Sequence, residues 1–189
     1  MSEQYKLFVP DSHENCTLAN FDWAGKAALK VLVEEVVSGK SKKGFILIGN
    51  PGVGKSHILV AIFRELLEKG KVLGSDILFL EFCKFVTESM DMCKIDGLLP
   101  ENVVDQIPAK IMIIDDVRPH WSGKFAGGIL RRMIESAYEN GKILIMSTNA
   151  ENPDDLVKVW NIEDYYASRL AEIATICLVK GKDWRVEKK

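Results

Sequence analysis

The sequence contains no hydrophobic run long enough to cross a membrane, because no stretch approaches the ~18 uninterrupted apolar residues that a bilayer span requires. Its first twenty residues include acidic and basic side chains and no apolar block, so no secretory signal is visible. Lys+Arg number 25 and Asp+Glu 27, a formal net charge of −2, so the chain lacks the basic excess of proteins that coat nucleic acid. We therefore expect a cytoplasmic protein.

Cysteine is scarce, and its four positions form no C-x-x-C pair. Closely spaced cysteines are typical of zinc sites, so we expect no zinc, and scattered cysteines favour reduced thiols in a cytosol. Low-complexity tracts and internal repeats are also missing. A chain of 189 residues without them suits one domain with a substantial core. We interpret the polar residues 1–22 as an N-terminal arm and residues 23–189 as the domain.

What the sequence does contain is a regular alternation of short apolar runs and amphipathic segments. The apolar runs predict strands that are buried on both faces, at residues 45–48, 77–82, 111–114, 143–146 and 175–179. Helical periodicity predicts helices over residues 23–38, 55–69, 83–92, 124–140 and 163–172. The alternation predicts an α/β fold, with a mostly parallel five-stranded sheet between two helical layers. Ligands of such sheets bind at the carboxyl ends of the strands.

The first predicted strand leads into a glycine-rich loop and then into a helix. Residues 49–56 match the phosphate-loop pattern G-x-x-x-x-G-K-[ST]. Glycines let consecutive backbone N–H groups turn toward phosphate oxygens, and the helix N-terminus adds partial positive charge. In this pattern Lys55 reaches the β- and γ-phosphates, and Ser56 holds Mg²⁺. The predicted nucleotide-binding residues are Gly49, Asn50, Pro51, Gly52, Val53, Gly54, Lys55 and Ser56, followed by His57, whose simplest role is packing behind the loop.

Two adjacent carboxylates, Asp115 and Asp116, follow the apolar part of the third predicted strand. Because parallel strand ends meet at one edge of the sheet, Asp115 is predicted to lie beside the phosphate loop and to coordinate Mg²⁺, directly or through water. Asp116 is placed to act as the general base that polarises an attacking water. A solvated acidic turn is the alternative, but the buried strand before the pair favours a site. Aspartate reaches one methylene less far than glutamate, which predicts slow hydrolysis.

The motifs together resemble AAA+ ATPases, and in particular the DnaC/IstB type of helicase loaders and transposition helper ATPases. The fourth predicted strand ends in Ser-Thr-Asn, where Asn149 matches the sensor-1 residue that orients water near the γ-phosphate. The string Ala-Ser-Arg-Leu around Arg169 is similar to the segment that carries the arginine finger. Near the end of the sequence, Gly-Lys-Asp-Trp-Arg resembles a family segment in which Arg185 either senses the γ-phosphate or is a solvated charge.

The resemblance implies a three-layer αβα P-loop fold without a C-terminal lid, ATP and Mg²⁺ as cofactors, and slow ATP hydrolysis that depends on assembly. It also implies a homo-oligomer joined through the ATP interface, in which the finger of one subunit acts on its neighbour's nucleotide. The implied role is in DNA replication, with a replicative helicase or single-stranded DNA as partner. Helicase loaders carry an additional N-terminal region that grips the helicase, and we expect residues 1–22 to be too short to supply it.

Three other functions stay open on the sequence. The chain is alternatively a transposition helper of the IstB type, or a low-turnover, nucleotide-dependent binding or regulatory protein. A P-loop nucleotide kinase would need an arginine-rich lid, for which Arg118, Arg131 and Arg132 are the candidates. In the loop after Asp116, His120 and Trp121 are candidates for stacking on a base or a partner, with loop anchoring as their ordinary role.

Overall fold

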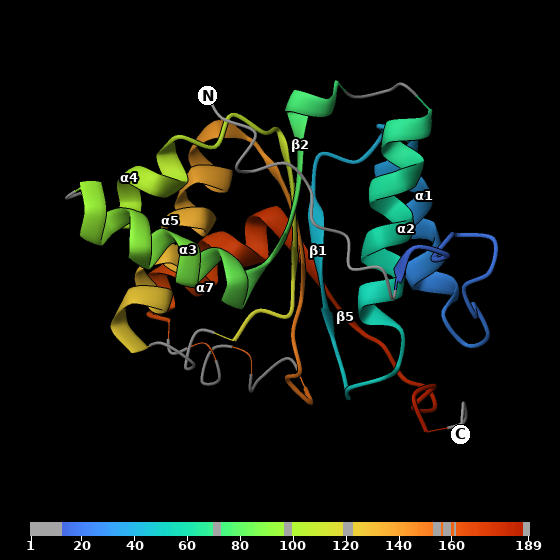
Figure 1. The fold of residues 1–189 in the computed structure, drawn as a ribbon. Coiled ribbons are helices and arrows are strands. Elements are labelled where there is room, and N and C mark those ends of the chain that lie inside the picture. The colour runs from blue at the N-terminus through green and yellow to red at the C-terminus, as the bar shows by residue number, and fades with distance from the viewer. Residues whose placement is uncertain are drawn as a thin grey trace.

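A five-stranded parallel sheet forms the centre of the molecule, with the strand order β2-β3-β4-β1-β5 (Figure 1). The computed structural model describes residues 13–69, 73–96, 100–118, 123–152, 156, 160 and 162–186. The strands are β1 Gly44–Ile48, β2 Ile77–Glu81, β3 Ile111–Asp115, β4 Ile143–Ser147 and β5 Ala174–Leu178. Every neighbouring pair in this sheet is parallel, so the sheet predicted from the apolar runs is confirmed.

Helices cover both faces of this sheet and make a three-layer sandwich (Figure 1). One face carries α1 Ala27–Ser38 and α2 Lys55–Glu68. The opposite face carries α3 Phe82–Asp96, α4 Pro100–Asp105, α5 Gly123–Asn140 and α7 Asp164–Ile173, and the short 3-10 helix η3 Gly74–Asp76 precedes β2. Residues 179–186, which the structure describes after β5, contain no helix. Across the described ranges, no helix is both long and apolar enough to span a bilayer.

Two local differences from the predicted elements have simple physical causes. The first helix begins at Ala27 rather than at Trp23, because Gly25 between them adopts a left-handed φ of 68°. Residues 100–105 form α4, a helix that was not among the predicted elements. Pro100 occupies the first helical position, where a missing N–H removes no intrahelical hydrogen bond, so a proline can begin this short helix.

The strand β1 is buried along its whole length because it lies inside the sheet, between β4 and β5. Its side chains alternate between two hydrophobic clusters. Phe45 and Leu47 join the cluster that includes α1 and α2, whereas Ile46 and Ile48 join the cluster that includes α5. A strand covered on both faces requires an uninterrupted apolar run. Because β1 is anchored in both hydrophobic clusters, the position at which the following loop leaves the sheet is fixed.

The carboxyl ends of the strands form a crevice at one edge of the sheet. The chain leaving β1 runs to α2 on one face, whereas the chain leaving β4 continues to α7 on the other face (Figure 1). Such a reversal between neighbouring strands leaves the space in which ligands bind in this fold class. The phosphate-loop motif follows β1 directly, so the fold places it at this crevice.

Residues 13–23 pack against the helical layer formed by α1 and α2. Cys16 and Phe21 are buried in the same cluster as residues of both helices. The Phe21 ring meets the Trp23 ring edge-on, with centroids 4.7 Å apart, and Trp23 Nε1 donates a hydrogen bond to Leu18 O at 2.9 Å. The described part of the predicted arm therefore contributes to the core. The division of the chain at residues 22 and 23 stays a prediction.

Substitution of Gly44 by alanine is expected to destabilise the pairing of β1 with β4. A Cβ at this position would lie 1.8 Å from the backbone oxygen of Leu144, in the neighbouring strand. We expect the free energy of unfolding to fall by about 2 kcal/mol, the usual size of an overpacking effect, measured by urea denaturation. Gly74→Ala is the control, because a Cβ there meets no atom within 4 Å. Equal stabilities for the two variants would contradict the close strand approach.

Candidate nucleotide-binding site

The loop between β1 and α2 depends on two glycines. Gly52 has a φ of 80° and Gly54 a φ of 96°, left-handed values that residues with a Cβ rarely adopt. Space at both positions is also limited, since a Cβ would lie 1.8 Å from the side-chain atom Asp183 Oδ1 at Gly52 and 3.1 Å from the Phe21 ring at Gly54. The loop ends at the N-terminus of α2, where unpaired backbone N–H groups can bind an anion.

Lys55 begins α2 and folds back over this loop. Its side chain is buried, and Nζ donates to Gly49 O at 2.6 Å, Asn50 O at 2.8 Å and Asn149 Oδ1 at 2.9 Å. These acceptors use all three N–H groups of the ammonium. Burial lowers the pKa of Lys55 to about 8, against the opposing effect of Asp115 and Asp116 at the end of β3. A bound phosphate would favour the charged ammonium.

The two carboxylates at the end of β3 are held by the end of β4. Ser147 Oγ donates to Asp115 Oδ1, and the backbone N–H of Asp116 donates to Ser147 Oγ at 2.9 Å. Asn149 Nδ2 donates to Asp116 Oδ1 at 3.3 Å, so one amide joins Asp116 to Lys55. The structure thus brings together four of the residues singled out in the sequence. Ser147 was missed, because in the sequence it is only the polar last residue of an apolar strand.

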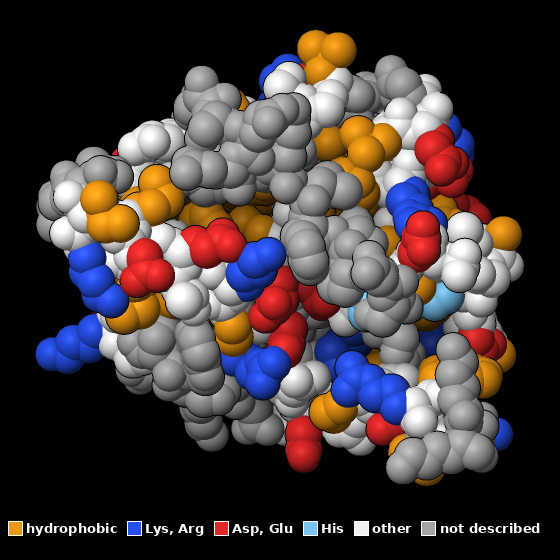
Figure 2. All heavy atoms as spheres, viewed as in Figure 1, with side chains coloured by type: hydrophobic (Ala, Val, Ile, Leu, Met, Phe, Trp, Pro, Cys, Tyr) orange, Lys and Arg blue, Asp and Glu red, His pale blue; other side chains and the backbone are white. Residues whose placement is uncertain are grey.

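Asp116 has a left-handed φ of 54°, which is unusual for a residue with a side chain. In this conformation its carboxylate contacts both Asn149 and Arg118, whose Nη2 donates to Asp116 Oδ2. The sequence suggested Arg118 only as a lid arginine of a kinase, and no sequence signal indicated this contact. Figure 2 shows acidic side chains near the centre of one face of the molecule, with basic side chains beside them.

Ser56 and His57 lie in the first turn of α2. Ser56 is half-buried next to Lys55, at the position from which a phosphate-loop hydroxyl holds Mg²⁺. His57 instead turns toward the N-terminal residues, with Nε2 3.1 Å from Thr17 O and 2.9 Å from Asn20 Oδ1. The ring also meets Phe21 edge-on, with centroids 5.4 Å apart. These contacts are those of a residue that packs behind the loop.

Ser56 and Asp115 carry the oxygen donors that the sequence assigns to a nucleotide-bound magnesium ion, a hydroxyl and a carboxylate. Mg²⁺ usually takes one or two protein oxygens and completes its shell with phosphate oxygens and water. Within the described ranges, no group of three or more His, Cys, Asp or Glu side chains is arranged to hold a metal ion.

Residues 183–185, after β5, lie against the phosphate loop. The Trp184 N–H donates to Gly52 O at 3.2 Å, and the Arg185 N–H donates to Asp183 Oδ1 at 2.9 Å. After burial, the positive charge of Arg185 also contributes to the lowered pKa of Lys55, so Arg185 lies within electrostatic reach of that ammonium. The Arg185 residue is exposed at the rim of the site, where either of its two predicted roles stays open.

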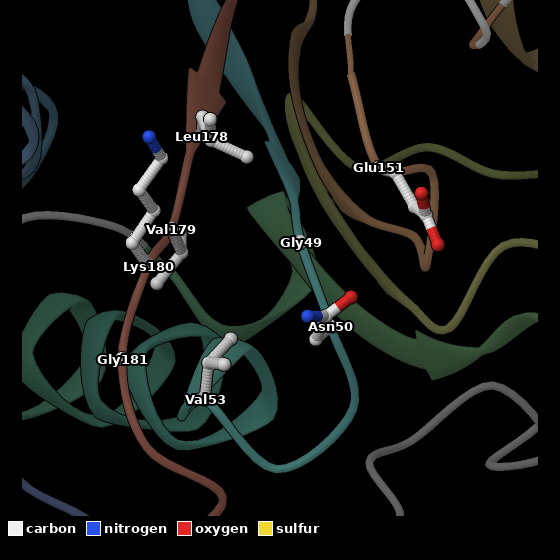
Figure 3. A pocket seen from close by; sticks show the side chains of 8 residues that line it. All are labelled: Gly49, Asn50, Val53, Glu151, Leu178, Val179, Lys180 and Gly181. Carbon is white, nitrogen blue, oxygen red and sulfur yellow. The ribbon is translucent and has the colours of Figure 1, made fainter.

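A pocket of about 380 Å³ opens beside the loop. It lies between the phosphate loop, the segment that follows β4 and the segment that follows β5 (Figure 3). The lining residues are Gly49, Asn50, Val53, Glu151, Leu178, Val179, Lys180 and Gly181. The volume is in the range of small-molecule sites. Glu151 and the four residues around the end of β5 were not predicted, since their approach depends on how the chain turns after the strands.

Arg169 makes its contacts elsewhere, between two helices. It lies on α7, and Nη1 donates to Glu135 Oε1 of α5 at 3.2 Å. Its guanidinium carbon lies 3.9 Å from the centroid of the Tyr165 ring and 4.9 Å from that of Tyr138. The side chain is only 19% exposed. The arginine that the resemblance assigns as a finger is therefore engaged within its own chain.

The other arginines considered in the sequence are also paired. Arg131 Nη1 lies 3.5 Å from Glu163 Oε1, and Arg132 Nε lies 2.6 Å from Asp105 Oδ1. Because these contacts join α5 to the start of α7 and to α4, they give no support to a kinase lid. The candidate stacking residues His120 and Trp121 lie outside the described residues.

Comparison with known proteins finds relatives whose sequences are similar to this chain. The chain is 23% identical over 154 residues to the replicative helicase loader DnaC of Escherichia coli (strain K12), covering 78% of this chain and 60% of DnaC. It is 23% identical over 182 residues to the putative ATP-binding protein of insertion sequence IS21 of Pseudomonas aeruginosa, covering 92% of this chain and 65% of that protein. The chain thus spans less than two thirds of the length of either relative.

The predicted fold class is confirmed by a crystal structure of the DnaC helicase loader. It matches with a TM-score of 0.75 at 17% identity, over 90% of this chain and 100% of that chain. The shared architecture is a five-stranded parallel sheet between helical layers. The model of one family, described as IstB-like ATP binding protein, matches residues 11–189. The chain therefore belongs to the IstB-like ATP binding protein family.

Proposed function

We propose that the chain is an ATP-dependent AAA+ ATPase of the helicase-loader type that acts in DNA replication. The observation that carries the proposal is the hydrogen-bonded series from Lys55 through Asn149 to Asp116, with Asp115 beside it. This series joins a phosphate loop to two carboxylates at the carboxyl edge of the sheet. It therefore holds a phosphate-binding cation next to a group that can accept a proton.

In the proposed reaction, the loop N–H groups and Lys55 bind the β- and γ-phosphates of ATP. Ser56 and Asp115 would hold the magnesium ion, which neutralises charge that develops on the phosphate oxygens. Lys55 is already turned toward the loop, so its ammonium exchanges backbone oxygens for phosphate oxygens without leaving the site. The buried position strengthens this contact, because few waters compete for the ammonium.

Asp116 and Asn149 would act on the attacking water. The water oxygen bonds to the γ-phosphorus, the bond from that phosphorus to the oxygen bridging to the β-phosphate breaks, and the water proton passes to the Asp116 carboxylate. Asn149 contacts both Lys55 and Asp116, so its amide lies between the phosphate-binding ammonium and the proton-accepting carboxylate. The products are ADP and inorganic phosphate.

The proposed partners are a replicative helicase, single-stranded DNA and further copies of this chain. The similarity to the helicase loader DnaC supports a replication role. Arg169 would act on the nucleotide of a neighbouring subunit, for which it must first leave Glu135 and the two tyrosine rings. The need to break these contacts fits ATP hydrolysis that is slow in the isolated subunit and faster in the assembly.

A transposition helper is the second candidate function. The similarity to the IS21 protein extends over 92% of this chain, a larger share than the similarity to DnaC. Both candidates use the same ATP site and differ in the protein that the ATP-bound form engages. A low-turnover binding protein would differ from both in hydrolysing almost no ATP.

Lys55→Ala and Asp116→Asn are expected to separate ATP binding from hydrolysis. Loss of a charged hydrogen-bond donor costs about 1.5–3 kcal/mol, so Lys55→Ala should raise the Kd for ATP roughly tenfold to a hundredfold. Asp116→Asn should bind ATP but hydrolyse it about 10²–10⁴-fold more slowly, since it cannot accept the proton. Titration with fluorescent ATP and phosphate release measure the two effects. Lys69→Ala, at the end of the same helix, is the control. Unchanged ATP binding and turnover in both variants would contradict the roles assigned to Lys55 and Asp116.

Arg169→Ala is expected to bind ATP normally and to lose assembly-stimulated hydrolysis, by roughly 10³-fold if the arginine acts as a finger. Mixing it with Lys55→Ala protein should restore hydrolysis, because the second variant brings an intact Arg169 to the first variant's nucleotide. The matched control mixes it with a chain that carries both substitutions, which cannot rescue. If Arg169→Ala hydrolyses ATP at the normal rate and only unfolds more easily, the residue is a structural link between α5 and α7.

A binding experiment distinguishes the two candidate partners. We expect the immobilised chain to retain the replicative helicase of its source organism in the presence of ATP, and Lys55→Ala to retain much less of it. The transposase of an IS21-type element is tested in parallel under the same conditions. Retention of the transposase without the helicase would favour the transposition helper and contradict the replication role.

A further inference from the structure

The carboxylate of Asp116 has a hydrogen-bond donor on each of its oxygens. Asn149 Nδ2 donates to Oδ1 at 3.3 Å, and Arg118 Nη2 donates to Oδ2. The first contact belongs to the series that leads to Lys55. The second comes from a residue only two positions further along the chain, for which neither a motif nor the resemblance assigns a role at this site. Arg118 therefore covers Oδ2 of Asp116, the proposed proton acceptor.

The backbone around Asp116 is fixed, whereas the arginine side chain has room to move. The Asp116 N–H is bonded to Ser147 Oγ at 2.9 Å, and the Val117 N–H is bonded to Ser147 O at 2.8 Å. Thr148 Oγ1 donates to Val117 O at 2.9 Å. The side chain of Arg118 is 45% exposed, against 27% for Asp116. Release of the carboxylate therefore requires movement of the guanidinium and not of the strand end.

The charges nearby explain why Arg118 docks at this point. Glu81, the last residue of β2, is in register with Asp115, so three carboxylates lie at neighbouring strand ends. Partial burial, followed by the two aspartates, raises the pKa of Glu81, and Arg118 opposes that rise. The hydrogen bond to Asp116 raises the pKa of Arg118. A guanidinium at this place relieves repulsion among the carboxylates.

We propose that Arg118 is a positioning residue that restrains Asp116 and so sets the rate of ATP hydrolysis. This inference rests on the proposed function. When water attacks the γ-phosphorus, its proton must pass to an Asp116 oxygen with a free lone pair. Each oxygen keeps a second lone pair, but the hydrogen bonds from Arg118 to Oδ2 and from Asn149 to Oδ1 fix the orientation of the carboxylate, so turning it toward the water breaks one of them. Arg118 is the one to leave, because Asn149 is also bonded to the buried ammonium of Lys55. The phosphates of bound ATP offer the guanidinium another anion.

The test compares Arg118→Ala and Arg118→Lys with the unaltered chain. Hydrolysis of radiolabelled ATP with magnesium is followed under single-turnover conditions, with protein in excess, so that slow chemistry still gives a rate. We expect Arg118→Ala to raise the maximal rate about threefold to tenfold, a modest part of what a general base contributes. The half-saturating protein concentration should change less, because Lys55 and the loop bind the phosphates. Arg118→Lys keeps the positive charge but loses the planar guanidinium, so its rate should fall between those of Arg118→Ala and the unaltered chain.

Arg131→Ala is the matched control, since that arginine pairs with Glu163 between helices. It should hydrolyse ATP at the rate of the unaltered chain, and unfolding curves establish that each variant is folded. A maximal rate for Arg118→Ala that is unchanged, reduced or unmeasurably low overturns the inference. If Lys55→Ala and Asp116→Asn behave as expected while Arg118→Ala is not faster, only the restraint fails. If those two variants bind and hydrolyse ATP normally, the proposed function itself fails.

Discussion

The site depends on one buried cation. Lys55 places its ammonium away from solvent, where an uncompensated charge would be costly, and three oxygen acceptors compensate it. Two of these acceptors are backbone oxygens of the phosphate loop, and the third is the Asn149 amide after β4. The conformation of the loop is therefore tied to a neighbouring strand. A conformational change in the loop therefore affects Asn149, and the reverse also holds, because the Lys55 ammonium must keep its three hydrogen-bond acceptors.

Much of this arrangement could be predicted, because the rules of parallel sheets bring strand ends together. An apolar run followed by polar residues identified Asp115 and Asp116, the phosphate-loop pattern identified Lys55, and the family resemblance assigned Asn149, all without knowledge of the strand order. The contacts between them needed only that β1, β3 and β4 end at the same edge of the sheet. Register then placed the side chains within hydrogen-bonding distance.

What could not be predicted depends on local backbone angles or on long-range packing. The contact of Arg118 accompanies a left-handed φ at Asp116, which no residue pattern signals. The approach of Asp183 to Gly52 depends on the path of the chain after β5. The engagement of Arg169 required Tyr138 and Tyr165, which lie on different helices. Residue type and family context assign an arginine a role, but they do not reveal which groups already hold it.

The segment after β5 gives the molecule a natural optical reporter. Trp184 is 46% exposed and its backbone is bonded to Gly52, so its indole lies at the rim of the phosphate loop. Trp160, by contrast, is 1% exposed inside the core. The emission of an indole shifts with the polarity of its surroundings, so Trp184 fluorescence should respond to occupancy of the loop without an attached dye, in addition to the emission of the chain's other three tryptophans.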